Sequence, residues 1–228
     1  MKKIAFLAVA SLLLSCGKEN ENPQDQYQSG FPVAIDMGLS VKWANANLGA
    51  TAPEDYGDYY AWGETEPKDN YLKETYKWIN DAGEISKYVA KGSDGIDDNN
   101  IVLDPEDDAA HVKLGGKWRM PTNSEISELV STRKNDNYQW EWTSLNGHDG
   151  WLVTYLVNNH SIFFPIAGFK SGTKTLDIGE YGHYWSSTLN STIYNSQDAW
   201  FMQLSRGSAG VYFDESRVMG LSVRPVSE

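Results

Sequence analysis

The sequence predicts an α+β fold, in which short mixed and antiparallel strands pack with two short-to-medium helices. The chain holds 9 Trp, 13 Tyr and 7 Phe, residue types that favour strands. Its 20 glycines are typical of tight turns between strands, so an all-α bundle is not expected. Two segments, residues 104–111 and 122–130, carry helix-start signals and supply the helical part of the prediction.

The first 15 residues have the pattern of a lipoprotein signal peptide. Lys2 and Lys3 form its basic start, and the apolar run over residues 4–14 is too short to span a bilayer as a helix. The run leads into the string LLSC at residues 13–16, which resembles the bacterial lipobox. In that motif the cysteine is acylated and becomes the mature N-terminus, so we expect Cys16, the one cysteine of the chain, to carry a membrane anchor.

Residues 16–30 are predicted to be a flexible tether, because they are polar and offer almost nothing to bury. A basic and acidic run at residues 18–21 follows Cys16 and resembles the export signal of Bacteroidetes surface lipoproteins. We therefore expect a lipid-anchored outer-membrane protein that faces the cell surface, with the periplasmic face as the alternative. Residues 31–228 are expected to form one domain.

The charge balance argues against a nucleic-acid partner. The formal net charge is −12, and loss of Lys2 and Lys3 with the signal peptide takes it to −14. Phosphate binding requires clustered basic side chains, which this sequence lacks. The domain after Cys16 contains no thiol, so we expect it to be stable without disulfides.

Three short strands are predicted early in the domain, over residues 33–37, 41–44 and 58–62. The polar, turn-rich segment 68–100 is expected to run over the surface. Its oxygen-rich end, residues 92–100, does not match a calcium loop, because Ile96 and Ile101 fall where an EF-hand needs ligands.

Residues 104–111 are predicted to form a capped helix rather than a metal site. Asp104 is placed at the N-cap and Pro105 at the first helical position, and the acids that follow face the positive end of the helix dipole. The four histidines of the chain are scattered singly, so no metal site is predicted.

The stretch GGKWRMPTNSEISELV at residues 115–130 is predicted to be a structural joint. Thr122 and Glu125 form a capping box, in which each side chain satisfies a backbone N–H of the helix start. Arg119 suits an ion pair with a carboxylate, because no glycine-rich phosphate loop surrounds it. The apolar face of the helix is expected from Ile126, Leu129 and Val130.

After this joint the chain is predicted to be rich in strands. Turns are expected at Asn146-Gly147 and Asn158-Asn159, where polar pairs interrupt runs of aromatic and β-branched residues. The strands are expected over residues 140–142, 151–157, 161–164, 183–187, 199–204, 210–214 and 221–226.

Several motifs occur in the order found in a known family. They are DMGLSVKWA at residues 36–44, YGDYYAWGET at 56–65, the segment 103–111, GGKWRMPT at 115–122, YWSS at 184–187 and SVRPV at 222–226. In these the chain resembles the Fibrobacter succinogenes major paralogous domain, which is abundant in gut Bacteroidetes lipoproteins. The resemblance implies a C-type lectin-like fold, related to formylglycine-generating enzymes and to variable receptor proteins of diversity-generating retroelements.

No enzyme and no cofactor are predicted. The catalytic cysteines of formylglycine-generating enzymes have no counterpart, and a domain without cysteine cannot bind copper through thiolates. The strings EPK at residues 66–68 and WIND at 78–81 do not fit the calcium-dependent sugar-binding motifs of C-type lectins. Nucleophile-elbow, phosphate-loop and zinc-protease motifs are absent from the sequence. Paired carboxylates for glycoside hydrolysis stay open, because the fold sets how close they come.

The C-terminal segment offers the strongest candidate for a ligand-binding surface. If Val211 and Phe213 point to the core, the two-residue period of a strand turns Tyr212 and Asp214 outward. Tyr, Asn, Ser and Arg together are typical of antibody paratopes, and in the retroelement-diversified relatives this segment faces the ligand. The candidate ligand-binding residues are Asn190, Tyr194, Asn195, Arg206, Tyr212, Asp214 and Arg217.

These observations predict a non-enzymatic binding or adhesion module on the outer membrane. It would recognise a glycan or protein ligand through its C-terminal loop surface, without a metal or a cofactor. The alternatives are a structural or interaction subunit of a surface assembly, and a formylglycine-generating-type enzyme, against which the cysteine count argues.

Replacement of Cys16 by serine should abolish anchoring. Cys16→Ser removes the sulfur that is acylated, and the sequence has no second apolar segment long enough to hold the protein in a bilayer. The variant should be found in the soluble fraction or as uncleaved precursor, and it should take up no radiolabelled palmitate. Equal palmitate incorporation into wild type and variant would contradict the assignment of Cys16.

Overall fold

The computed structural model describes residues 32–90, 98, 100–191 and 196–228, and it is mainly β. Of these residues, 39% lie in strands and 13% in helices. The predicted α+β class is therefore wrong, and several small sheets with two short α-helices give no clear C-type lectin-like assignment. Strand content exceeds the prediction because backbone pairing continues beyond the apolar centre of several strands, which reach eight or nine residues.

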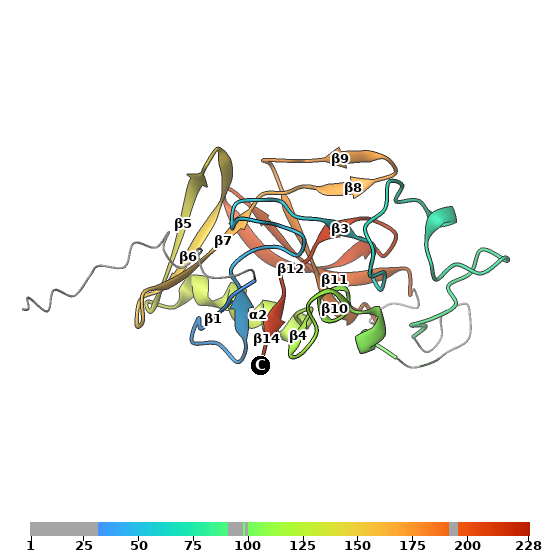
Figure 1. The fold of residues 1–228 in the computed structure, drawn as a ribbon, viewed down its shortest axis with the longest axis horizontal. Coiled ribbons are helices and arrows are strands. Elements are labelled where there is room, and N and C mark those ends of the chain that lie inside the picture. Colours follow the sequence, from blue (N-terminus) through green and yellow to red (C-terminus); the bar gives the residue numbers. More distant parts are fainter. Residues whose placement is uncertain (1–31, 91–97, 99, 192–195) are drawn as a thin grey trace, which may run out of the picture.

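One small sheet joins the start of the domain to its end (Figure 1). Its four strands lie in the order β1 (Ala34–Ile35), β2 (Lys42–Ala44), β14 (Val226–Ser227) and β4 (Trp118–Arg119). Val226 lies opposite Trp43 on one side and Arg119 on the other. The C-terminal strand therefore closes the fold between two earlier segments.

A five-stranded sheet carries the C-terminal part of the chain. Its strands lie in the order β12 (Ser208–Ser216), β11 (Asp198–Ser205), β10 (Gly182–Leu189), β13 (Leu221–Ser222) and β3 (Tyr59–Tyr60). The pairing is antiparallel except between β10 and β13. β12 lies at one edge of this sheet, and in the described part of the chain it pairs with β11 alone.

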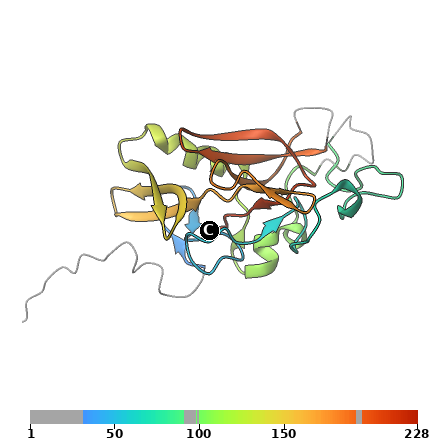
Figure 2. The same cartoon turned by 90° about the horizontal axis from the view of Figure 1, so that it is seen from above.

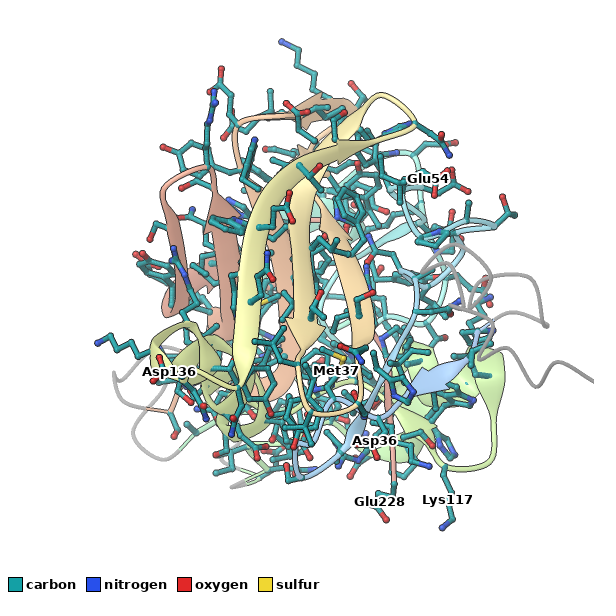
Figure 3. All side chains as sticks on the ribbon, turned by 90° about the vertical axis from the view of Figure 1, so that its left-hand side faces the viewer. Asp36, Met37, Glu54, Lys117, Asp136 and Glu228 are labelled. Carbon is teal, nitrogen blue, oxygen red and sulfur yellow. The ribbon has the colours of Figure 1, made fainter. Side chains whose placement is uncertain are left out.

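The middle of the chain forms a meander of three antiparallel strands, β5 (Tyr138–Leu145), β6 (His148–Tyr155) and β7 (His160–Pro165). The predicted Asn146-Gly147 turn is confirmed, with both residues at positive φ as a tight hairpin turn requires. Figure 3 looks onto this sheet and shows Glu54 near the turn, where Asn146 Nδ2 donates to its carboxylate. A further hairpin follows, formed by β8 (Phe169–Ser171) and β9 (Lys174–Leu176).

The helices are short. They are the 3-10 helices η2 (Lys73–Thr75), η3 (Pro105–Asp107) and η4 (Thr132–Lys134), and the α-helices α1 (Ala109–Leu114) and α2 (Asn123–Ser131). The prediction of one continuous helix over residues 104–111 is wrong, because this segment forms two separate helices, η3 and α1. Asp108, not Asp104, caps α1 by accepting from His111 N, while Lys87 holds the Asp104 carboxylate. No helix among the described residues has the length and hydropathy to cross a bilayer.

The predicted capping box at the start of α2 is confirmed. Thr122 Oγ1 accepts from Glu125 N at 3.3 Å, and the Glu125 carboxylate accepts from Thr122 N at 2.8 Å. Arg119 holds the same carboxylate through two hydrogen bonds of 2.8 and 2.6 Å. Burial acts to raise the pKa of Glu125, but the bonds from Arg119 and Thr122 outweigh it, so this pKa is lowered.

Hydrophobic clusters cover both faces of the five-stranded sheet. On one face, Ile126 and Leu129 of α2 join a cluster with Met202 and Leu204 of β11. Figure 2 shows α2 beside the β11–β12 hairpin, against which it packs. On the other face, Phe201 of β11 belongs to a second cluster. Because side chains alternate along a strand, β11 contributes to both clusters.

Loss of the capping hydroxyl should destabilise the domain modestly. Thr122→Ala removes the acceptor for Glu125 N and should lower the free energy of unfolding by about 1 kcal/mol. Thr122→Ser keeps the acceptor, so this matched control should stay close to wild type in a urea titration. Equal stability of the alanine variant and wild type would show that the cap does not hold α2.

Candidate functional site

Two of the predicted ligand-binding residues are buried, and others lie outside the described residues. Tyr194 and Asn195 lie outside, as does the predicted lipid attachment site Cys16. Asn190, which follows β10, and Arg217, which follows β12, are both 0% exposed. Neither side chain can contact a ligand from solvent, so the assignment of these two residues to a binding surface is wrong.

The Arg217 side chain is a structural clamp. Its guanidinium donates four hydrogen bonds of 2.8 to 3.1 Å, to Tyr76 Oη and to the backbone oxygens of Lys87, Tyr88 and Ser196. Its Cζ lies 4.7 Å from the centroid of the Trp62 ring. Among the described residues no carboxylate lies within 4 Å of Arg217. Burial raises the pKa of Tyr76 to about 12, which keeps this phenol a neutral acceptor.

Arg206, Tyr212 and Asp214 are exposed, but the hairpin does not bring all three together. Arg206 lies in the two-residue turn between β11 and β12. The start of β11, next to Ser196, is eight residues away, or about 25 Å at the rise of a strand. Arg206 and the start of β11 therefore lie at opposite ends of the hairpin.

β12 alternates as predicted up to Tyr212. Val211 packs against the core cluster that contains α2, and Tyr212 is 39% exposed on the other face of the strand. The side chain of Phe213, which was predicted to point inward, lies outside the described part of the structure.

A bulge in β12 decides which acid shares the face of Tyr212. Phe201 lies opposite Tyr212 and Ala199 lies opposite Glu215, so β12 has one residue more than β11 between these pairs. The extra residue shifts the alternation of side chains by one, so residues beyond the bulge point to the opposite face from the one that simple alternation gives them. Glu215 therefore takes the place on this face that simple alternation gives to Asp214.

His183 links Glu215 to Gln203 on the same face. His183 Nδ1 lies 3.2 Å from Glu215 Oε2, and His183 Nε2 lies 3.1 Å from the Gln203 amide nitrogen. A neutral imidazole that donates from Nδ1 and accepts at Nε2 satisfies both contacts. These contacts leave the second Glu215 oxygen and the Gln203 amide oxygen as acceptors for a ligand.

Aromatic rings surround this polar group. Phe169 of β8 stacks on His183 with ring centroids 4.9 Å apart, and Phe201 lies 5.1 Å from His183 on another side. Tyr181 lies 6.3 Å from His183 and Tyr212 lies 5.8 Å from Phe201, and each tyrosine is 39% exposed. We refer to this surface as the aromatic patch, formed by Phe169, Tyr181, His183, Phe201, Gln203, Tyr212 and Glu215.

Tyr212 leans over β12 because Gly210 has no side chain. The two residues are two positions apart and share a face of the strand. A Cβ at position 210 would lie 2.8 Å from Tyr212 Cε2, closer than such contacts occur. The absence of that atom lets the Tyr212 ring lie along the strand with a face toward solvent.

A cavity of about 270 Å³ lies beside the 115–130 joint, but Asp108 and Arg119 in its lining already have structural partners. Asp108 accepts from the backbone N–H groups of His111 and Met120, and burial raises its pKa. Arg119 pairs with Glu125, which fits the structural role predicted for this stretch.

No three His, Cys, Asp or Glu side chains in the described part of the chain are grouped so that they could hold a metal ion. The 92–100 segment, weighed above as a calcium loop, lies outside the described residues except at positions 98 and 100.

Sequence reasoning found one residue of the aromatic patch, Tyr212. His183 was not predicted because a single histidine has no motif around it. Glu215 was not predicted because the bulge that moves it to this face has no sequence pattern. A usable signal existed for Phe201 and Gln203, because alternation along β11 places them together on one face.

Comparison with known proteins gives one match. A family model described as a domain of unknown function (DUF8237) matches residues 147–226, which is less than half of the chain. This segment contains every residue of the aromatic patch. No curated protein and no solved structure matches the chain.

The two arginines of the C-terminal segment should respond differently to substitution. Arg217→Met leaves four acceptors, three of them buried, without their donor and should lower the free energy of unfolding by on the order of 3 kcal/mol. Arg206→Met changes an exposed turn residue and should shift that energy by less than about 0.5 kcal/mol. Chemical denaturation measures both, and an Arg217 variant as stable as wild type would rule out the clamp.

Proposed function

We propose that the protein is a lipid-anchored, non-enzymatic binding module of the outer membrane that recognises a glycan through the aromatic patch. The observation that carries this proposal is the exposed Tyr212 ring, which leans over Gly210 on the face that holds Glu215. An aromatic face beside fixed hydrogen-bonding groups suits a ligand with an apolar C–H surface and a rim of hydroxyls. A sugar ring has both features.

Each part of the patch matches one part of a sugar. Ring C–H groups carry a partial positive charge and pack on the negative face of an aromatic ring such as Tyr212. Hydroxyl groups donate to the free oxygens of Glu215 and Gln203. Because His183 already holds both of these side chains, little conformational entropy is lost when they bind.

The size of the patch favours an oligosaccharide over a single sugar. Its two exposed tyrosines, Tyr181 and Tyr212, are joined through His183 and Phe201 by three ring-to-ring steps of 6.3, 5.1 and 5.8 Å. One sugar on Tyr212 leaves Tyr181 open to a neighbouring unit of the same chain.

The membrane assignment rests on the sequence. Acylation at Cys16 supplies the anchor, and the polar residues 16–30 supply a tether that lets the patch reach ligands away from the bilayer. Cys16 is the one cysteine of the chain, which leaves the folded domain without the thiols that a formylglycine-generating-type enzyme uses.

Removal of the Tyr212 ring should weaken glycan binding with little loss of stability. A glycan array probed with the wild-type protein supplies the ligand. Tyr212→Ala should then weaken binding by about 1 to 3 kcal/mol, because an exposed ring that carries binding energy contributes little to folding. Titration calorimetry measures the affinity, and thermal unfolding measures the stability.

Two further variants sharpen this test. Gly210→Ala keeps the tyrosine but moves its ring, so it should also weaken binding. Val157→Ala changes an exposed apolar residue on the β6–β7 turn and should bind as wild type does. Wild-type affinity in Tyr212→Ala, loss of binding in EDTA, or capture of a protein but no glycan would each contradict the proposal.

A further inference from the structure

The side of β12 that faces away from the aromatic patch borders a groove. This groove, of about 570 Å³, lies between α2 and β12. Val130 of α2 and Ala209 and Val211 of β12 form its apolar floor, and all three are partly buried against the core. The glycan proposed above uses none of these residues, so the groove is a separate feature of the same strand.

On its unpaired edge, β12 has backbone N–H and C=O groups that belong to the residues lining this groove. In an antiparallel ladder, residues that exchange hydrogen bonds with the partner alternate with residues whose N–H and C=O point away from it. The two-residue turn closes on the pair Ser205 and Ser208, which places Ala209 and Val211 at the outward positions. The residues that line the groove thus also direct unpaired donors and acceptors to the edge of the sheet.

The rim of the groove is basic, although the chain is acidic. Arg133 and Lys134 line it and are exposed, and among the described residues no carboxylate lies within 4 Å of either. The Arg133 guanidinium lies 5.0 Å from the centroid of the Trp151 ring, which restricts its motion. The Glu128 carboxylate of α2 accepts from Ser40, and in the described part of the chain it forms no ion pair with Arg133 or Lys134.

We propose that an extended, acidic peptide segment of a partner protein binds in this groove as an added strand on β12. Its backbone pairs with Ala209 and Val211, alternate side chains enter the apolar floor, and its carboxylates meet Arg133 and Lys134. A peptide fits because the free N–H and C=O groups recur every two residues, a spacing that another strand reproduces. The bulge beyond Tyr212 ends regular pairing, which limits the added strand to about four or five residues.

Binding of labelled heptapeptides to the full-length protein tests this proposal by fluorescence anisotropy. The probe is the peptide SEVEVES, compared with its basic counterpart SKVKVKS and with a version of SEVEVES that is N-methylated at alternate residues. We expect the acidic peptide to bind with a Kd on the order of 10 to 100 μM. The basic and the N-methylated peptides should bind at least about tenfold more weakly, because one repels the rim and the other lacks backbone donors.

Two protein variants locate the site. Arg133→Gln with Lys134→Gln should weaken SEVEVES binding by about tenfold and leave glycan binding unchanged. Lys117→Gln with Lys174→Gln also removes two exposed positive charges, but away from the groove, so this matched control should have no effect. In a ¹⁵N-labelled sample, the amide resonances of Ala209 and Val211 should shift on addition of the acidic peptide.

Four results would overturn the proposal. They are equal binding of the acidic and basic peptides, binding that is insensitive to N-methylation, no binding at about 1 mM peptide, and unshifted amides at Ala209 and Val211. A dimer in sedimentation that the double variant disrupts would assign the groove to a second copy of this chain instead.

Discussion

The buried guanidinium of Arg217 holds the C-terminal hairpin to the rest of the domain. Arg217 directly follows β12, and its guanidinium donates to the backbone oxygen of Ser196, just before β11. It also donates to Tyr76 and to the backbone of residues 87–88, so it fixes the open end of the hairpin against them. A buried charge is costly without partners, and here neutral oxygens and the Trp62 ring replace water. Arg224 joins other distant segments in the same way, through Asn47, Ala44 and Phe163. Sheets too small to be stable alone are thereby connected into one fold.

With its open end fixed, β12 presents two different surfaces. Tyr212 and Glu215 share the aromatic patch on one face, while Ala209 and Val211 border the basic groove on the other. Two departures from a regular strand create this division. Gly210 gives the Tyr212 ring its position, and the bulge brings Glu215 rather than its neighbour to His183. The glycan and the peptide proposed above would therefore contact opposite faces of one edge strand and would not compete.

The features that could be predicted from the sequence are those formed by residues close together in the chain. The capping box of α2 and the Asn146-Gly147 turn depend on contacts within four residues, and both were found as predicted. Arg217 and Arg206 gave the same signal in sequence, yet Arg217 is buried by partners 129 to 141 positions away. Glu215 was not predicted as a site residue, because the two-residue alternation of a strand does not reveal where a bulge interrupts it. The α+β class failed for a similar reason, since pairing lengthened strands beyond their apolar centres.

Tyrosine-ring NMR during a glycan titration tests the aromatic patch most directly. With ¹³C-labelled tyrosine rings, the resonances of Tyr212 and Tyr181 should shift in proportion to bound glycan, because these are the exposed rings of the patch. Tyr60 and Tyr76 are buried and should not respond. Shifts confined to Tyr138, in the β5–β6–β7 sheet, with Tyr212 and Tyr181 unchanged, would contradict a glycan site on this face.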